Sequence, residues 1–506
     1  MEIRIMKRRW KIFFAVGVFL ILMAASLMVT MHVLPRNEVE AYKKLLRDKG
    51  EKLEISAVLP PPAAPEDNSA NAVEDAFRMF GSGFENIPRA MQMVAPGKAM
   101  IGWRQPDARS DDFTNSWDAF GAAVEANRPA VELLHQVLQR PKLDFQLDYK
   151  KGVGILLPHL SPLKRSAQKL DAAAIYELHN GDIGAAATNI LTMLALVHKN
   201  APEGLLISHL VRTAMATIAV APTWELLQAT NVTDAQLVAL QKGWEQMDFL
   251  SDAENAFVLE RACTSVTIQE SRNSHKGFIE TFGLGWSDIP EDFAKGPRLA
   301  IAEIMWRSSW SYTAELHTLK NTQVILETIR TMETNRSQFY KADYDAMLSR
   351  LSLLGFTSRG EAFFSALKIP DFRGGFENWG MSPVIRKTLQ IETARRVVIT
   401  AIALKRFQLK HGQWPETLAE LAPEFFQTAP LDPYDGKPLK YRPNADGTFL
   451  LYSVGEDGVD DGGDFSPVKP SPLGSLHWNW QHARDWVWPQ PALPEEVQKF
   501  YEHPRK

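Results

Sequence analysis

Residues 391–404 read Ile-Glu-Thr-Ala-Arg-Arg-Val-Val-Ile-Thr-Ala-Ile-Ala-Leu, and this stretch specifies one amphipathic helix. Its apolar positions recur with the spacing of a single helix face: Ala394, Val397, Val398, Ala401 and Leu404. The opposite face carries the basic side chains Arg395, Arg396, Lys405 and Arg406. Gly412 suits the left-handed position that closes a helix, so we expect the helix to end beside it.

Turn and strand signals follow this helix. Pro415 begins a predicted short helix that carries Leu418 and Leu421. The run Pro430-Leu-Asp-Pro-Tyr-Asp-Gly436 predicts a turn, and residues 438–442 and 448–453 predict the two strands of a hairpin. The expected order of helix, short helix, turn and hairpin defines a small α+β module over residues 386–466.

An acidic loop follows the second predicted strand and reads Tyr452-Ser-Val-Gly-Glu-Asp-Gly-Val-Asp-Asp-Gly-Gly-Asp464. Carboxylates and carbonyls at close spacing suit Ca²⁺, and glycines allow a tight wrap around the ion. The candidate ligands are Asp457, Asp460, Asp461 and Asp464. The loop is not an EF-hand, because Val459 stands where an oxygen ligand is needed. The alternative is a solvated acidic turn that binds nothing.

The helix, both turns, the hairpin and the S-x-G-x-D-G loop together resemble the globular domain of the major pseudopilins of type II secretion systems. The resemblance covers residues 391–464 and implies a structural calcium ion in the acidic loop, with Asp457 and Asp464 at matching positions. The glycine and Phe-Thr-Leu-Ile-Glu-like signature of that family is absent before the apolar N-terminal run at Ile12. We therefore expect a membrane protein that carries such a module, not a subunit that polymerises.

The N-terminus predicts a membrane anchor. Residues 12–34 are apolar apart from Ser26, Thr30 and His32, a length sufficient to cross a bilayer core of about 30 Å. Five basic residues precede this run and predict a cytoplasmic N-terminus with the bulk of the chain outside the cytoplasm, anchored in the cell (inner) membrane. The rival interpretation is a signal peptide cleaved near Ala24, but the apolar run is longer than the usual ~7–15 residues.

The remaining chain predicts a mainly α-helical protein in six segments. Residues 172–186 predict a helical hairpin around Asn180-Gly181-Asp182, Thr233 to Gln236 predicts a capping box, and residues 299–332 a long helix. Alternation over residues 143–149 predicts an isolated strand. The expected segments are a basic cytoplasmic segment (1–11), the transmembrane anchor (12–34), a juxtamembrane helix with a stiff proline-rich spacer (35–70), the helical body (71–385), the pseudopilin-like module (386–466) and a tail rich in tryptophan and proline (467–506).

Composition excludes several classes of function. The chain has 56 basic and 60 acidic residues, so it lacks the excess of positive charge that is typical of nucleic-acid-binding proteins. The single cysteine, Cys263, excludes an intramolecular disulfide and a cysteine-based zinc site. In the tail, four tryptophans either cover the hairpin or form a partner-binding surface: Trp478, Trp480, Trp486 and Trp488.

No catalytic motif occurs in the sequence, neither a phosphate-binding loop, nor a zinc protease helix, nor a serine hydrolase elbow. The leading hypothesis is a non-enzymatic, membrane-anchored extracytoplasmic scaffold or interaction protein with a secretion-associated role and a protein partner. One alternative is a cell-envelope hydrolase with its site in the helical body. Another is a peptide-binding module of helical repeats, although only one repeat-like hairpin is found, and an array needs about three.

Overall fold

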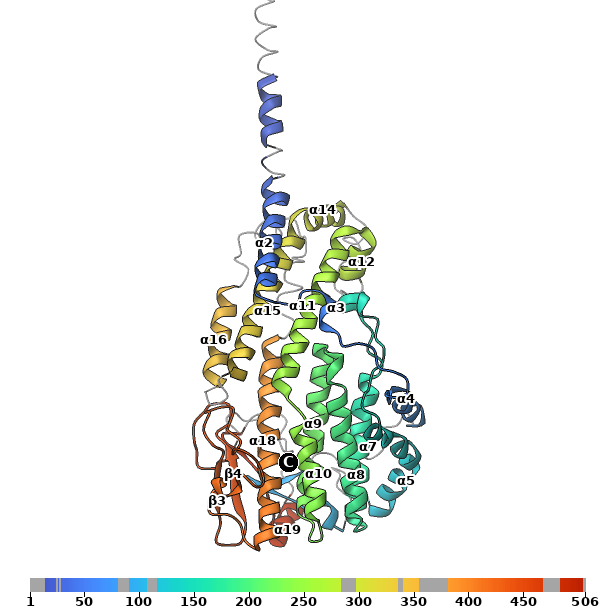
Figure 1. The fold of residues 1–506 in the computed structure, drawn as a ribbon, viewed down its shortest axis with the longest axis vertical. Coiled ribbons are helices and arrows are strands. Elements are labelled where there is room, and N and C mark those ends of the chain that lie inside the picture. Colours follow the sequence, from blue (N-terminus) through green and yellow to red (C-terminus); the bar gives the residue numbers. More distant parts are fainter. Residues whose placement is uncertain are drawn as a thin grey trace, which may run out of the picture.

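The computed structural model describes residues 14–23, 26, 29–80, 91–106, 116–283, 297–334, 340–354, 381–466 and 483–503. The chain is mainly helical, which confirms that part of the expected fold class. Figure 1 shows an elongated body of upright helices with one helical stem leaving its end. The main helices of the body are α4 (Ala70–Met79), α5 (Trp117–Leu134), α7 (Leu160–His179), α8 (Ile183–Lys199), α9 (Leu206–Leu227), α10 (Asp234–Glu245), α11 (Phe249–Asn273), α12 (His275–Gly283), α14 (Pro297–Met305), α15 (Ser311–Thr334), α16 (Tyr340–Leu353) and α18 (Met381–His411).

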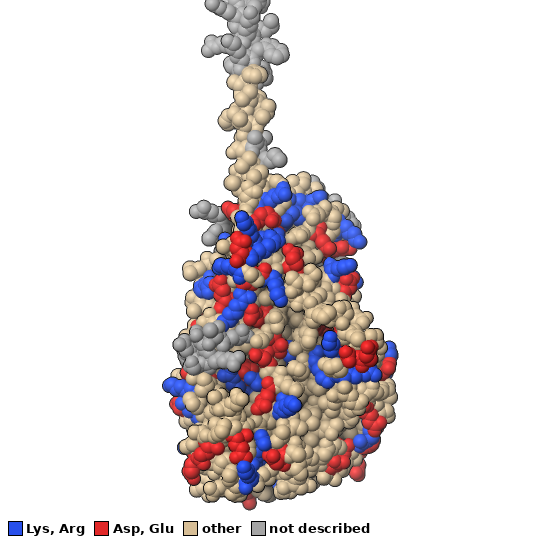
Figure 2. Space-filling model, viewed as in Figure 1, with Lys and Arg blue, Asp and Glu red and all other residues tan. Residues whose placement is uncertain are grey.

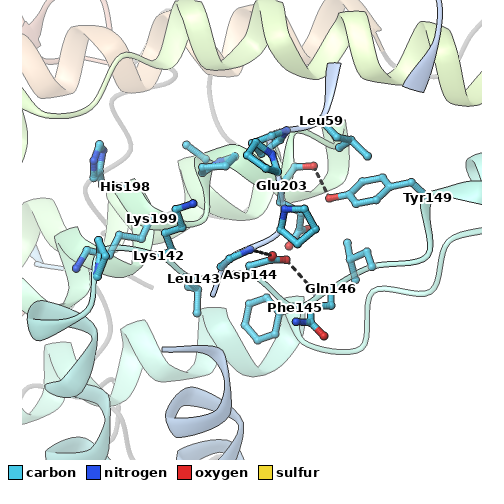
Figure 3. A pocket seen from close by; sticks show the side chains of 18 of the residues that line it. Leu59, Lys142, Leu143, Asp144, Phe145, Gln146, Tyr149, His198, Lys199 and Glu203 are labelled. Atoms are coloured by element: carbon cyan, nitrogen blue, oxygen red, sulfur yellow. Dashed lines mark hydrogen bonds between the residues drawn. The ribbon is translucent and has the colours of Figure 1, made fainter. Parts of the chain in front are cut away.

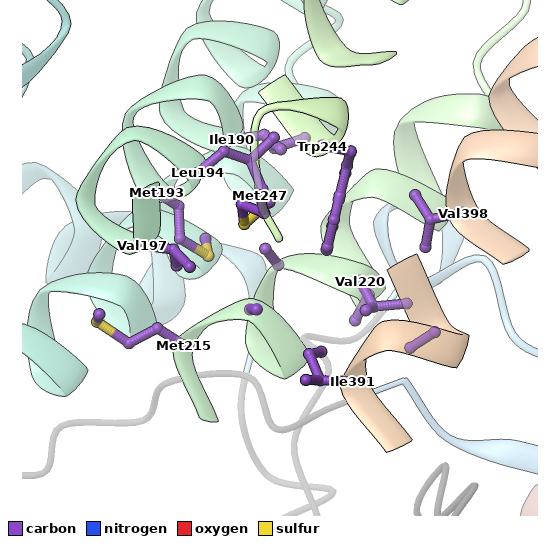
Figure 4. Packing of buried hydrophobic residues seen from close by; sticks show 14 of the residues in the cluster. Ile190, Met193, Leu194, Val197, Met215, Val220, Trp244, Met247, Ile391 and Val398 are labelled. Carbon is purple, nitrogen blue, oxygen red and sulfur yellow. The ribbon is translucent and has the colours of Figure 1, made fainter. Parts of the chain in front are cut away.

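Helix α9 lies at the centre of the body and contacts α7, α8, α11 and α18. Among the described residues it is the one helix long and apolar enough to cross a membrane, and 67% of its apolar window is buried inside the body. Figure 4 shows Val220 of α9, Trp244 of α10 and Val398 of α18 around the same apolar interior. Trp244 and Val398 are fully buried there. The helix therefore has the burial of a core element.

Local signals place several helix ends correctly. The predicted hairpin consists of α7 and α8, and the Asp182 side chain accepts a hydrogen bond from the Ala185 backbone N–H at its turn. Thr233 and Gln236 form the predicted capping box of α10. Helix α18 ends at His411, and Gly412 adopts φ +76° while its N–H donates to the Gln408 carbonyl. These predictions are confirmed.

The C-terminal module shares its core with the helical body. Strands β3 (Lys440–Pro443) and β4 (Phe449–Ser453) form the predicted antiparallel hairpin. Strand β5 (Trp486–Val487), which the sequence did not indicate, extends the sheet along β4. Leu451 of β4 and Trp486 belong to the same apolar cluster as the residues of α9 and α18. The module therefore packs as part of the body.

The described part of the tail is structural. Trp486 and Trp488 are buried, and the Trp486 ring meets the Tyr434 ring edge-on at 5.2 Å. Strand β6 (Gln490–Pro491) then pairs in parallel with β2 (Lys98–Ala99), which itself pairs with β1 (Met93–Ala95). Helix α19 (Pro494–Glu502) ends the described chain. Trp478 and Trp480 lie outside the described residues.

Two predictions for the regions before α7 are wrong. Residues 143–149 form no strand, and the only bridge nearby joins Lys142 to Asn68. The proline-rich segment is not a spacer that stands away from the body, because the Ala63 N–H donates to Asp144 Oδ2 at 2.9 Å. Prolines have no N–H for a β ladder, and the contact continues just after them, where Asn68 and Ser69 bond to Asp144 and Lys142. Residues 59–63 thus form a strap across the body.

The stem consists of the helix Phe14–Met23, the π-helical turn Val29–Val33 and α2 (Leu34–Asp48). In its first part, Phe14, Ile21 and Leu22 are 76%, 69% and 63% exposed. Figure 2 shows this part as a column without charged side chains, whereas charge begins where the body begins. Apolar side chains on this helix therefore contact no part of the described body.

Candidate functional site

The four aspartates of the acidic loop each have other partners, and Asp461 and Asp464 both lie near the Arg484 guanidinium. Asp457 accepts from the Val459 N–H at 3.0 Å, and Asp464 accepts from the Ser466 hydroxyl at 2.7 Å. Asp460 accepts from the Tyr452 hydroxyl at 2.7 Å, and this bond lowers the pKa of Asp460. The Asp461 carboxylate lies 3.6 Å from the Arg484 guanidinium.

The predicted calcium ligands do not converge in this arrangement. Within the described ranges, no group of three His, Cys, Asp or Glu side chains is placed to hold a metal ion. Because Ca²⁺ takes six to eight oxygen ligands, the carboxylates would have to move together to bind the ion.

A buried aspartate that the sequence analysis missed organises the loop from behind. Asp485 is fully buried, and its Oδ2 accepts from the N–H groups of Gly463 and Asp464 at 2.7 and 3.1 Å. Burial raises the pKa of Asp485, although these backbone bonds oppose the shift. Asp485 lies in the tail, 21 residues from Asp464, so no local pattern connects it with the loop.

A second buried aspartate ties the predicted turn to the start of the loop. Asp432 accepts from the Tyr434 N–H, the Ser453 hydroxyl and the Val454 N–H at 2.8 to 2.9 Å. Burial raises its pKa to about 6. This turn, which is part of the pseudopilin resemblance, therefore has a structural role. It joins the segment that follows α18 to strand β4.

The strap covers one side of a pocket of about 1070 Å³. Its walls are largely apolar, and the strap residues face the extended segment 142–147 across it. Figure 3 shows His198, Lys199 and Lys142 grouped at one end and Tyr149 at the other. We call this site the strap pocket; its apolar lining includes Leu59, Pro60, Pro61, Pro62, Leu143, Phe145 and Leu147. A largely apolar pocket of this size with a few polar side chains is a candidate ligand site.

Three charged side chains of the strap pocket, Asp144, Lys199 and Glu203, bond to its walls. The Glu203 carboxylate accepts from the Ser208 hydroxyl and lies 2.8 Å from His159 Nε2. Lys199 donates to the carbonyls of Val137 and Arg140, and burial lowers its pKa. Because Glu203 stands between the hydroxyl and the imidazole, the histidine cannot act as base toward Ser208, as nucleophilic catalysis requires.

Buried ion pairs clamp the stem to the body, and we call them the stem clamp. Glu51, which follows α2, accepts from Arg261 of α11 and from Arg330 and Gln323 of α15. Burial raises the pKa of Glu51, but these three partners outweigh it and hold the pKa at about 2. Lys43 of α2 adds a pair with buried Glu315 at 2.6 Å.

No protein-family model matches the chain, and no curated protein or solved structure is similar to it. The pseudopilin resemblance of residues 391–464 thus stays a prediction from the sequence.

Proposed function

We propose that the chain is a non-enzymatic, single-pass membrane protein that holds a helical interaction domain outside the cytoplasm. The observation that carries the proposal is the stem helix Phe14–Met23, whose large side chains are exposed: Phe14, Phe19 and Ile21 at 76%, 65% and 69%. Exposure of this much apolar surface in water is unfavourable, and a bilayer removes it. The basic residues at positions 4–11 favour a cytoplasmic N-terminus.

The stem clamp supports a scaffold role. Arg261 is 1% exposed and Glu315 is also buried, so the stem cannot swing away without leaving buried charges unpaired. A partner that binds the body is therefore held at a fixed height and orientation relative to the anchor.

The strap pocket is the proposed docking place for a protein partner. Its walls are apolar and its carboxylates already have partners, which supports binding of apolar side chains over chemistry on a bound molecule. The strap also presents a polyproline segment, a preformed surface that costs little entropy to bind. A photo-crosslinking residue at Phe145 should form a protein adduct, whereas the same residue at Leu409, exposed on α18, should not.

Calcium at the acidic loop is a separate part of the proposal. Asp457, Asp460, Asp461 and Asp464 would have to exchange their present partners for the ion. All four lie within one glycine-rich loop, which makes such a rearrangement local.

Fractionation of the full chain tests the anchor. We expect the protein to stay in membranes washed with alkaline carbonate, and the body to be digested by protease added outside the cytoplasm. Release by carbonate would refute the anchor, and digestion only after lysis would refute the orientation.

A further inference from the structure

The stem and helix α15 run side by side in a fixed register. The His32 ring donates from Nδ1 to the Ser308 carbonyl at 2.9 Å, and its ring meets the Tyr312 ring edge-on at 5.7 Å. Further along both helices, Lys43 pairs with Glu315 at 2.6 Å. The two helices are therefore parallel, and Ser308 lies level with His32. His32 is two residues from the end of the apolar run 12–34.

Helix α14 precedes α15 in the chain and lies at the same end of the body. It runs from Pro297 to Met305 and joins α15 through the π-helical turn Trp306–Trp310. At 1.5 Å per residue, Ile304 and Ile301 lie within about 6 and 10 Å of Ser308, measured along the helix. Figure 1 shows α14 at the end of the body from which the stem leaves.

One face of α14 is buried against the body. Ala302 and Trp306 are fully buried and pack with Phe278 of α12 in an apolar cluster separate from the main core. The Trp306 indole N–H donates to the Ser271 hydroxyl at 3.0 Å. This cluster fixes the rotation of α14 about its axis, and so decides which side chains face outward.

The outward face carries two isoleucines one helical turn apart. Ile301 is 47% exposed and Ile304 is 65% exposed. Single exposed apolar side chains are ordinary, but an adjacent pair on a helix that already has a buried face is a candidate contact surface.

Basic side chains surround this end of the body. Arg36 is exposed just after the apolar run, and the Lys276 and Arg307 side chains are 83% and 45% exposed. Figure 2 shows Lys and Arg, with Asp and Glu among them, where the stem meets the body; Lys276 pairs with Glu280 and Arg307 with Glu303. Apolar side chains beside Lys and Arg are the composition of helices that lie in the interface of anionic bilayers.

We infer that α14 is a second membrane contact, in which Ile301 and Ile304 enter the interface of the bilayer that the stem crosses. The inference rests on the proposed function, because the stem must span the membrane for His32 to lie at its boundary. Ser308 is then at the level of the head groups, and α14 lies at the same end of the body. Two contacts, the stem and α14, would stop the body from tilting on its anchor.

Lipid quenching of site-specific probes in the full chain tests this inference. We would reconstitute Ile304→Cys in vesicles of phosphatidylcholine and phosphatidylglycerol, and label it with an environment-sensitive fluorophore. The native Cys263 is 1% exposed and burial raises its pKa to about 12, so it should not react. Lipids spin-labelled near the head group should quench the probe about twofold or more relative to a probe at Leu409→Cys, an exposed site at the far end of α18. Ile301→Cys repeats the measurement at a second position.

A probe at Leu22→Cys in the stem separates the two proposals. Quenching at Leu22 by lipids labelled deep in the acyl chain, together with quenching at Ile304, supports the inference. Quenching at Leu22 alone overturns it and leaves the anchor intact. No quenching at Leu22 overturns the anchor and the inference together. A probe at Ile304 that is shielded from water but unquenched by lipid indicates a protein cover, which also overturns the membrane contact.

Discussion

The stem clamp and the acidic loop are both clusters of charged side chains, yet they differ in burial. In the stem clamp, the Glu51 side chain is 4% exposed and accepts hydrogen bonds from two arginines and a glutamine. In the acidic loop, the side chains of Asp460 and Asp464 are 46% and 44% exposed, and their cation partners lie 3.4 to 3.8 Å away. Solvent screens the loop pairs, while the clamp pairs act in a medium of lower dielectric.

This difference shows that a conspicuous sequence does not identify the charges that matter most for stability. The loop concentrates its aspartates in one run, whereas the clamp gathers its charges from three distant segments. Removing one partner of a buried network leaves the other charge uncompensated, but an exposed charge is simply hydrated.

The largest effect should come from Glu51→Ala. Arg261 would remain buried without its carboxylate, so we expect a loss of about 3–5 kcal/mol in unfolding free energy, measured by urea denaturation. The pKa of Glu51 falls from 4.5 to about 2 on folding, so its stabilising effect is complete above pH 4.5 and disappears as the pH falls toward 2. Glu54→Ala is the matched control, because its side chain is 68% exposed and should cost under about 1 kcal/mol. Equal losses in both variants would contradict the comparison.

Asp485→Ala should have the next largest effect, and it tests whether the loop depends on a buried group. The variant leaves the N–H groups of Gly463 and Asp464 without their acceptor, at a cost of about 1–3 kcal/mol. Hydrogen exchange at these two amides should speed up as well. Asp461→Ala, which removes only a screened contact with Arg484, should leave both measurements near those of the native chain.

The variant Glu260→Gln tests the effect of burying a carboxyl group near the stem clamp without pairing it with a cation. Burial raises the pKa of Glu260 from 4.5 to about 7, although the Leu206 N–H opposes this. The native chain should therefore lose stability as the pH rises from 4.5 to 7, since the unfolded state releases its proton first. The glutamine variant lacks this loss, and we expect it to gain about 1 kcal/mol or more on the native chain between pH 4 and 8. A stability difference that does not change with pH would rule out this role for Glu260.

The smallest effect on stability should come from Asp457→Ala combined with Asp464→Ala. Both side chains accept hydrogen bonds within their own turns, and Asp464 adds only a screened contact with Arg484, so we expect a change of about 0.5 kcal/mol without calcium. If the loop binds Ca²⁺, the native melting temperature rises with added Ca²⁺ and falls back with EGTA, while the double variant does not respond. An equal response in both proteins would place any calcium elsewhere.

Sequence patterns predicted the elements whose causes are local. The end of α18 at Gly412, the turn before Ile183 and the capping box at Thr233 depend on residues within a few positions of one another. The strand predicted from the alternation in residues 143–149 does not form. A period of two indicates which side chains face inward, but not whether a partner strand exists. The pairing of β6 with β2 had no signal, since each strand has only two residues.

The sequence by itself determined that this protein is mainly helical, where several helices and the hairpin begin and end, and that an apolar segment precedes the body. Helix periodicity and turn chemistry act over a few residues, so the amino-acid order is sufficient for them. Only the tertiary structure decided that the Glu51 and Asp485 side chains are buried, that the proline segment is a strap over a pocket, and that α14 lies at the end of the body from which the stem leaves. These features depend on which segments, distant in the sequence, pack together and exclude water. Burial away from water sets the free-energy cost of an unpaired charge.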